Sequence, residues 1–261
     1  MNIHSQAPSA ENISWLRDRV NGIHQRNRQR GSASWCGHTY DFTCPSHETY
    51  PFQWFWDSCF HAIALSHIDI NKAEAELFSL LKNQHADGFI SHVTFWQRDV
   101  YEEMVSTYDI AFRTKYLSDE MQPPLLAEAV NAVAQRGRGK DFLKEILPGV
   151  IRFYEWCHAV RSPYNDGLIR VIQPDETGLD HSPKWDELMK IRDEEHISFE
   201  RGWKLICDQY LPFNRDPKKM IATDYFIVAD VMVNVIYIEN LRVLAQLCAS
   251  IGDGEGEKRY A

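Results

Sequence analysis

Stretches with helical periodicity follow one another along most of the chain, and this pattern is the strongest limit on its fold. An Asp-Gly pair ends or follows such a stretch twice, at Asp87-Gly88 and at Asp166-Gly167, 79 residues apart. A weak repeat of this length is typical of an array of αα-hairpins. The sequence therefore predicts an all-α fold of helical hairpins. The expected helices cover residues 12–30, 71–88, 121–136, 141–161, 196–211 and 224–252.

Other positions suggest how individual segments begin, bend or pack. Pro148 is expected to kink or split the helix at 141–161. Ser182, followed by proline, predicts the start of a further helix, because serine is a good N-cap and proline suits the first turn. Residues 31–52 predict a long irregular loop. The helix at 12–30 is expected to be amphipathic, with apolar positions at Ile13, Leu16, Val20 and Ile23.

The charge balance and the apolar runs argue against two kinds of partner. The 261 residues carry a net charge of −9 and a pI near 5.6 without a basic stripe, so nucleic acid is not an expected partner. No apolar run approaches the roughly 18 residues of a membrane span, and the N-terminus lacks the blocks of a signal peptide. We therefore expect a cytoplasmic protein without a membrane partner.

Cysteine and histidine spacing predicts neither a disulfide framework nor a metal site. The six cysteines show no CxxC spacing and lie mostly in apolar helical contexts, which indicates reduced core thiols. A Cys36–Cys44 pair is the alternative that stays open. The eleven histidines show no ligand spacing such as HxxxH, so no metal and no cofactor is expected.

The most informative loop is a proline-bounded acidic stretch at residues 173–186, QPDETGLDHSPKWD. It holds four carboxylates, Asp175, Glu176, Asp180 and Asp186. A carboxylic acid stays protonated near neutral pH when apolar walls or a like charge surround it, and Asp180 and Glu176 have both close in sequence. The simpler interpretation is a surface turn that caps the following helix. Both can hold, because a helix N-terminus is also a place for chemistry.

Aromatic side chains crowd around another carboxylate, Asp57, in the segment YPFQWFWDSCFHA at residues 50–62. The faces of Trp54 and Trp56 could stack on the C–H face of a sugar ring, and a carboxylate accepts hydrogen bonds from paired hydroxyls. A buried acceptor left unpaired costs about 1–3 kcal/mol, so such a site discriminates between ligands. The alternative is a helix N-terminus anchored by core aromatics, with Asp57 as its cap.

Four segments together resemble one enzyme family. ETGLDHSPKWD is similar to the E-S/T-G-x-D-x-S-P-x-W-D signature of glycoside hydrolase family 63, in its bacterial mannosylglycerate and glucosylglycerate hydrolase branch, and trehalases carry a related version. YPFQWFWDSCFHA, DGFISHVTFW and QPPLLA resemble further segments of this family. The resemblance implies an αα-hairpin toroid, the (α/α)6 barrel, of which residues 1–261 would be the incomplete, N-terminal part.

Carried over residue by residue, the resemblance also implies a site. Asp180 falls on the general acid, in a catalytic-acid loop at 172–186, and residues 31–55 fall on a lid. Family members bind the glycerate carboxylate with Arg and Tyr side chains from about the region 187–221, where Arg192, Arg201 and Arg215 are available and Phe199 stands where Tyr is common. The implied substrate-binding residues are Tyr50, Trp54, Trp56, Asp57, Gln84, Asp87, His92, Trp96 and Glu176.

No residue of the chain matches the family's general base, a Glu of its C-terminal part. An inverting glycosidase needs a second carboxyl roughly 6.5–9.5 Å from the acid, and Glu176 is expected to shape Asp180 instead. Three interpretations stay open: a hydrolase of a small α-glucoside or α-mannoside such as glucosylglycerate or mannosylglycerate, a truncated or degenerate relative that binds sugar without hydrolysis, and a non-enzymatic helical scaffold. An unclosed ring would expose apolar helix faces, which permits a homo-oligomer.

Overall fold

Helical hairpins form the body of the molecule, in a computed structural model that describes residues 9–189, 198–223 and 225–261. The strands are short: β1 (Arg28–Ser32), β2 (Thr39–Thr43), β3 (Gln53–Trp54) and β4 (Val93–Thr94). Three 3-10 turns are η1 (Pro174–Thr177), η2 (Pro183–Trp185) and η3 (Leu211–Phe213). The helices are α1 (Ala10–Asn27), α2 (Phe55–Ser66), α3 (Ile70–Leu81), α4 (Arg98–Tyr108), α5 (Leu126–Ala134), α6 (Lys140–Arg161), α7 (Phe199–Gln209), α8 (Pro217–Met220), α9 (Val231–Ile251) and α10 (Gly254–Tyr260).

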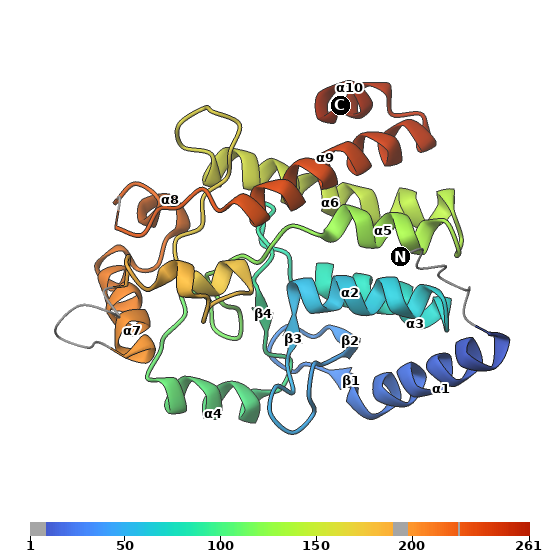
Figure 1. Cartoon of the computed structure of the whole chain (residues 1–261), viewed down its shortest axis with the longest axis horizontal. Coiled ribbons are helices and arrows are strands. Elements are labelled where there is room, and N and C mark those ends of the chain that lie inside the picture. Colours follow the sequence, from blue (N-terminus) through green and yellow to red (C-terminus); the bar gives the residue numbers. More distant parts are fainter. Residues whose placement is uncertain (1–8, 190–197, 224) are drawn as a thin grey trace, which may run out of the picture.

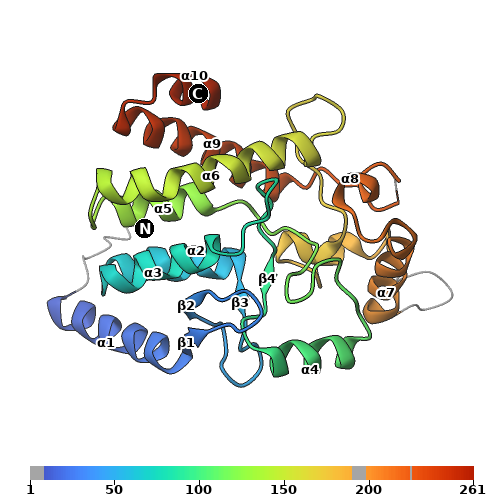
Figure 2. The ribbon, with the colours of Figure 1, turned by 180° about the vertical axis from the view of Figure 1, so that it is seen from behind.

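Three pairs of helices stack on one another in sequence order. Figure 1 shows α2 with α3, then α5 with α6, then α9 with α10, and Figure 2 shows the same order from behind. Helix α2 packs on α5, and α5 packs on α9. One apolar core runs through all three pairs; it includes Phe55, Leu77, Leu126, Phe153 and Leu244, all buried. The predicted all-α array of hairpins is confirmed.

The ends of several helices differ from the sequence prediction. Helix α5 starts at Leu126, because a proline pair at 123–124 disfavours helical backbone just before it. Helix α3 ends at Leu81, before the predicted Asp87-Gly88 stop. Pro148 lies inside α6, which continues through it as one helix. The helix expected after Ser182 is only the 3-10 turn η2, and the Ser182 side chain does not cap it.

Helix α9 begins later than predicted, because Asp230 is its N-cap. The Asp230 carboxylate accepts a hydrogen bond from the backbone N–H of Val233 at 3.0 Å. By length and composition alone, α9 is long and apolar enough to cross a membrane, but half of that window is buried inside the protein. The buried amide of Asn240 accepts the backbone N–H of Glu128 at 2.9 Å. These contacts are those of a core helix in the hairpin array.

The first helix forms as predicted but does not bury the predicted face. Ile13, Leu16 and Ile23 on α1 are each about half exposed. Residues 28–30, expected in this helix, belong to β1, which pairs antiparallel with β2 in the register Arg28↔Thr43 to Ser32↔Thr39. An Arg28–Asp41 ion pair of 2.5 Å crosses the two strands. Strand pairing here overrides the local helical preference.

The predicted irregular loop at 31–52 was wrong over β2 and over the last two residues of β1. In β2, Tyr40 and Phe42 are buried on one face of the strand, and they pack with Cys44 and Trp96 in a small apolar cluster. Strand β3 pairs with β4 at Gln53↔Thr94 and Trp54↔Val93. These strands escape sequence prediction because each is at most five residues long and is held by its partner. The lid assignment of residues 31–55 stays a prediction.

The two Asp-Gly pairs adopt the same local geometry, which accounts for the weak repeat. Asp87 accepts the backbone N–H of Phe89 at 3.2 Å, and Asp166 accepts that of Leu168 at 3.0 Å. Gly88 and Gly167 both have positive φ angles, of 101° and 77°. Each turn therefore uses an aspartate to bind its own backbone two residues on and a glycine to reverse the chain.

Candidate active site

One cavity of about 940 Å³ brings together residues that lie far apart in the sequence. Asp57 comes from the first turn of α2, and Asp180 comes from the acidic stretch after η1. Both carboxylates line this cavity, as the sequence-based hypothesis required. Six of the predicted residues line it: Tyr50, Trp54, Trp56, Asp57, His92 and Asp180.

Strand pairing fixes the start of α2 and with it the aromatic residues around Asp57. The Phe55 N–H donates to the His92 carbonyl at 2.8 Å, which continues the β3–β4 ladder. The Trp56 N–H donates to the Gln122 side-chain oxygen at 2.9 Å. Segments around residues 55, 92 and 122 therefore converge at one end of α2. A helix N-terminus favours a carboxylate, which is the position of Asp57.

The environment of Asp57 leaves its carboxylate open to a ligand. Burial raises the pKa of Asp57 to about 6, although its own backbone N–H and His92 act in the opposite direction. No other described residue donates a side-chain hydrogen bond to it. Close by, the Trp54 indole N–H is buried without a partner among the described residues. A hydroxylated ligand could donate hydrogen bonds to the Asp57 carboxylate, which lines the cavity.

Replacing Asp57 should stabilise the protein at neutral pH. The pKa of Asp57 rises from 3.8 to about 6 on folding, so the folded state binds this proton more tightly than the unfolded state. The stability that the proton contributes to the fold is lost as pH rises through 6. We expect Asp57→Asn to raise the melting temperature at pH 7.5, by the equivalent of at most about 3 kcal/mol, less where water reaches the cavity. The gain should vanish below pH 4. Circular dichroism melts at pH 4, 6 and 7.5 measure it, and equal melting temperatures throughout would contradict it.

A buried ion pair anchors the acidic stretch at residues 173–186 to helix α6. Glu176 is fully buried, and its carboxylate contacts Arg161 at the end of α6 at 2.5 Å. It also accepts the backbone N–H groups of Met121 at 2.9 Å and of Ile172 at 2.7 Å. Three segments therefore meet at one carboxylate. Glu176, predicted to bind substrate, lies outside the cavity lining, because all of its acceptor positions face protein donors.

The acidic turn passes close to Trp56, and only glycine allows this approach. Gly178 has a φ of 65°, and a Cβ built on it would lie 2.2 Å from Cζ2 of Trp56. The Thr177 hydroxyl donates to the Pro174 carbonyl at 2.7 Å, and the Trp185 indole donates to the Leu179 carbonyl at 3.0 Å. The turn that carries Asp180 is thus stabilised by its own hydrogen bonds and packs against the Trp56 ring.

A methyl group at Gly178 should therefore displace Trp56. We expect Gly178→Ala to destabilise the fold by about 1–3 kcal/mol, because strain at positive φ adds to the overlap with the ring. Gly37→Ala is the matched control, since Gly37 has a φ of 73° with no atom near its Cβ position. Urea unfolding compares the two variants, and equal losses would show that the Trp56 contact carries no cost.

The surroundings of Asp180 differ from those that the sequence suggested. The Asp180 side chain is 44% exposed, and its carboxylate lies 3.5 Å from Nε2 of His181. His181 in turn stacks on Phe199 of α7, with ring centroids 3.8 Å apart. Trp185, an apolar residue close to Asp180 in sequence, points into the core, where it is 2% exposed and packs against Phe226. Asp180 therefore faces the cavity with few protein contacts.

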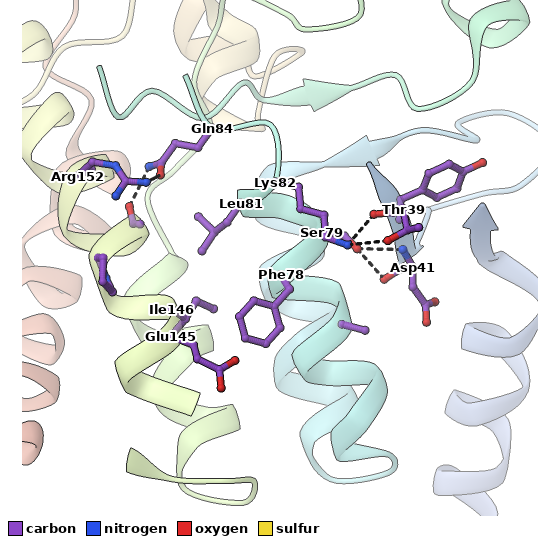
Figure 3. A pocket seen from close by; sticks show the side chains of 14 residues that line it. Thr39, Asp41, Phe78, Ser79, Leu81, Lys82, Gln84, Glu145, Ile146 and Arg152 are labelled. Carbon is purple, nitrogen blue, oxygen red and sulfur yellow. Dashed lines mark hydrogen bonds between the residues drawn. The ribbon is translucent and has the colours of Figure 1, made fainter. Parts of the chain in front are cut away.

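Gln84 lies in a different hollow. This second hollow, of about 650 Å³, lies between α3 and α6 beside β2 (Figure 3). Gln84 accepts from Arg152 at 2.6 Å and donates to the carbonyl of Gly149 at 2.8 Å. At the other end, Lys82 donates to the backbone oxygen of Thr39 at 2.6 Å. Gln84 thus joins α6 to the end of α3.

Trp96 and Asp87, also predicted to bind the substrate, make hydrogen bonds within the protein. Trp96 is buried, and its indole N–H donates to the Gln53 side chain at 2.8 Å. The Asp87 carboxylate accepts the backbone N–H of its own turn. Neither residue lines the cavity.

Arg215, one of the arginines offered for the glycerate carboxylate, lies in a buried ion-pair cluster. Arg215 lines the cavity and pairs with Asp119 at 3.0 Å and with Glu120. Burial and the neighbouring Glu120 raise the pKa of Asp119 to about 7. For Glu120, burial is opposed by Arg215, His92 and a backbone N–H, which together lower its pKa to about 2. The Arg215 charge is therefore balanced within the protein. Further lining residues that went unmarked are Gln122, Gln173, Asp175, Trp203 and Lys204.

Helix α7 brings cationic side chains to the cavity. Arg201 lines it, is exposed, and makes no ion pair with another described residue. Lys204 lines it too, but pairs with Asp208 at 3.0 Å and with Asp109 at 3.4 Å. Arg192, the remaining predicted cation, lies outside the described residues. Of Arg201, Lys204 and Arg215, only Arg201 has no ion pair with a described carboxylate.

The described residues contain no cluster suited to a metal ion. No group of three or more His, Cys, Asp or Glu side chains within them is arranged to hold one. The six cysteines are free thiols, and five of them are buried. Cys36 and Cys44, the pair left open by the sequence, are both unpaired.

Residues 50–261 match the family described as the mannosylglycerate hydrolase MGH1-like glycoside hydrolase domain. The chain belongs to this family. Mannosylglycerate hydrolase of Thermus thermophilus is 31% identical over 221 residues, which are 75% of this chain and 53% of that protein. Glucosylglycerate hydrolase of Mycolicibacterium hassiacum is 30% identical over 153 residues, 52% of this chain and 34% of that one.

Solved structures of the family show the same fold. The GH63 mannosylglycerate hydrolase from Thermus thermophilus in complex with Tris matches with a TM-score of 0.78 at 26% identity, over 94% of this chain and 62% of that one. The same enzyme with Tris and D-glycerate gives a TM-score of 0.76, over 93% and 62%. The all-α hairpin toroid expected for the family is confirmed, and the chain spans about half the length of its curated relative from Thermus.

Proposed function

We propose that this chain forms the sugar-binding and acid-bearing part of an inverting glycosidase that cleaves small α-glycosides of glycerate. The observation that carries this is the meeting of Asp57, Trp56 and Asp180 in one cavity. Its relatives are named mannosylglycerate and glucosylglycerate hydrolases, and solved relatives bind D-glycerate and glucose. These names support a sugar–glycerate ligand for the same cavity.

The proposed roles follow from the position of each group. Asp180 donates a proton to the glycosidic oxygen as the bond to the anomeric carbon breaks. Water attacks that carbon from the opposite face, and a second carboxyl roughly 6.5–9.5 Å from the acid takes its proton. We assign this base to the part of the family fold that lies beyond the match. Asp57 accepts hydrogen bonds from sugar hydroxyls, and Trp54 and Trp56 contact the ring.

The glycerate carboxylate is proposed to lie near α7. Arg201 brings a positive charge to the cavity without an ion pair among the described residues. Arg215 attracts an anion less strongly, because its charge is balanced by Asp119 and Glu120, which both contact it. An anionic ligand is therefore drawn toward Arg201 and away from Asp57, Asp175 and Asp180.

Hydrolysis by the full-length protein tests the proposal. Mannosylglycerate and glucosylglycerate should release D-glycerate and free sugar, and trehalose should be cleaved less well. Proton NMR during the first minutes should show the β-anomer of the sugar, as inversion of an α-glycoside requires. Release of the α-anomer would exclude inversion. Binding of the glycosides without release would favour the sugar-binding relative, and no binding would exclude both.

A further inference from the structure

The acidic turn carries a second cavity-lining carboxylate, Asp175, whose contacts resemble those of a ligand-binding group. Its Oδ2 accepts a hydrogen bond from the indole N–H of Trp203 at 2.6 Å, and the Gln173 amide nitrogen lies 3.5 Å from the same oxygen. Its Oδ1 has no hydrogen-bond partner among residues 9–189, 198–223 and 225–261. One oxygen is therefore anchored, and the other can accept a hydrogen bond from a ligand.

Asp175 repeats, on another element, the combination seen at Asp57. Trp203 lines the cavity from α7, as Trp56 does from α2. The acidic turn lies between these two rings, because Trp56 packs against Gly178 and Trp203 binds Asp175. A carboxylate next to an indole ring suits a hydroxylated, partly apolar ligand, and such pockets use a few polar groups to orient it. Two such combinations in one cavity indicate two binding positions.

The charges around Asp175 specify what its open oxygen can accept. Burial raises the pKa of Asp175 to about 7, with Glu120 and Asp180 adding to this effect and His92 and Trp203 opposing it. Near neutral pH the group is therefore protonated in part of the molecules, and it can accept or donate a hydrogen bond. A ligand carboxylate would be repelled here by Asp180 and Glu120. Neutral hydroxyl groups are the matching chemistry.

We propose that Asp175 and Trp203 form a second subsite beside Asp180, which binds neutral hydroxyl groups of the ligand that the Asp57 position does not hold. The cavity volume of about 940 Å³ lies at the upper end of the range for small-molecule pockets, roughly 300–1,000 Å³, and gives room for both positions. This inference rests on the proposed function, because it assigns a second contact to the same glycoside. Its ligand class is a glycoside that turns uncharged hydroxyl groups toward Asp175, while its carboxylate lies near α7.

Asp175→Asn tests the subsite because its amide oxygen can still accept from Trp203. Calorimetry with the purified protein measures the affinity for mannosylglycerate and glucosylglycerate, and a thermal melt is recorded for each variant. We expect Asp175→Asn to weaken binding of both glycosides at least tenfold without lowering the melting temperature. Asp141→Asn, on the exposed first turn of α6, is the matched control and should bind as the wild type does.

The remaining outcomes each decide the question. Affinity of Asp175→Asn within twofold of the wild type would overturn the subsite alone. A loss of affinity together with the same fall in melting temperature as Trp203→Phe would show that Asp175 only anchors α7, which also overturns it. A wild-type protein that binds neither glycoside would overturn the proposed function, and the subsite with it.

Discussion

Asp180→Asn in the full-length protein is expected to reduce the hydrolysis of mannosylglycerate by a factor of about 10²–10⁴, the usual contribution of a general acid. An asparagine amide occupies the same space but cannot transfer a proton to the glycosidic oxygen. The structure makes this a clean substitution, because the Asp180 side chain is 44% exposed and its carboxylate lies 3.5 Å from Nε2 of His181, with no Lys or Arg ion pair among the described residues. Affinity for the substrate should stay within about threefold.

A substrate with a leaving group that needs no protonation separates the proposed acid from a binding role. We expect a dinitrophenyl glycoside of the same sugar to be cleaved by Asp180→Asn at a rate much nearer that of the wild type. Asp141→Asn serves again as the control. Activity of Asp180→Asn toward mannosylglycerate within a few-fold of the parent would remove Asp180 from the acid role. An equal loss on both substrates would point to a displaced turn.

Glu176→Ala is expected to destabilise the protein by about 3–5 kcal/mol, the typical cost of leaving one member of a buried ion pair without its partner. Arg161 is fully buried and would keep its charge, while the N–H groups of Met121 and Ile172 would lose their acceptor. Urea unfolding measures the loss. Glu239→Gln is the matched control, since its ion pair with Arg242 is largely exposed and should contribute less than about 1 kcal/mol.

The double variant Arg161→Met/Glu176→Leu shows whether the ion pair or the space that it fills matters. Removing both charges with side chains of similar volume is often close to neutral in buried pairs, so we expect much of the lost stability to return. The Met121 and Ile172 N–H groups would still lack an acceptor, so recovery should be partial. A Glu176→Ala protein as stable as the parent would mean that the pair does not hold the acidic turn.

The hairpin array could be predicted from periodicity because its helices bury apolar stripes against neighbours in sequence order. The signature at 176–186 and the segment at 50–62 likewise indicated the two carboxylates that share the cavity. Prediction failed where an element depends on a distant partner. Strand β3 pairs with β4 at Gln53↔Thr94, and the exposed face of α1 shows that an apolar stripe alone does not locate the core.

Residue roles within the site divide in the same way. The sequence marked Glu176 and Gln84 for the substrate, but a single sequence cannot show which donors surround a carboxylate or an amide. Only the folded chain places Arg161 on Glu176, and only α7 brings Trp203 to Asp175. Those contacts join residues 15 and 28 positions apart, at distances of 2.5 Å and 2.6 Å, and no local pattern encodes them.

The sequence by itself determined the helical class, the hairpin order and the loop that carries Asp180, because periodicity, turn residues and short motifs are local properties. The tertiary structure alone decided which carboxylates face the cavity and which are used up inside the protein, because burial and hydrogen-bond partners depend on segments that meet only when the chain folds. Asp175 and Glu176 are neighbours, yet one lines the cavity and the other holds the core together.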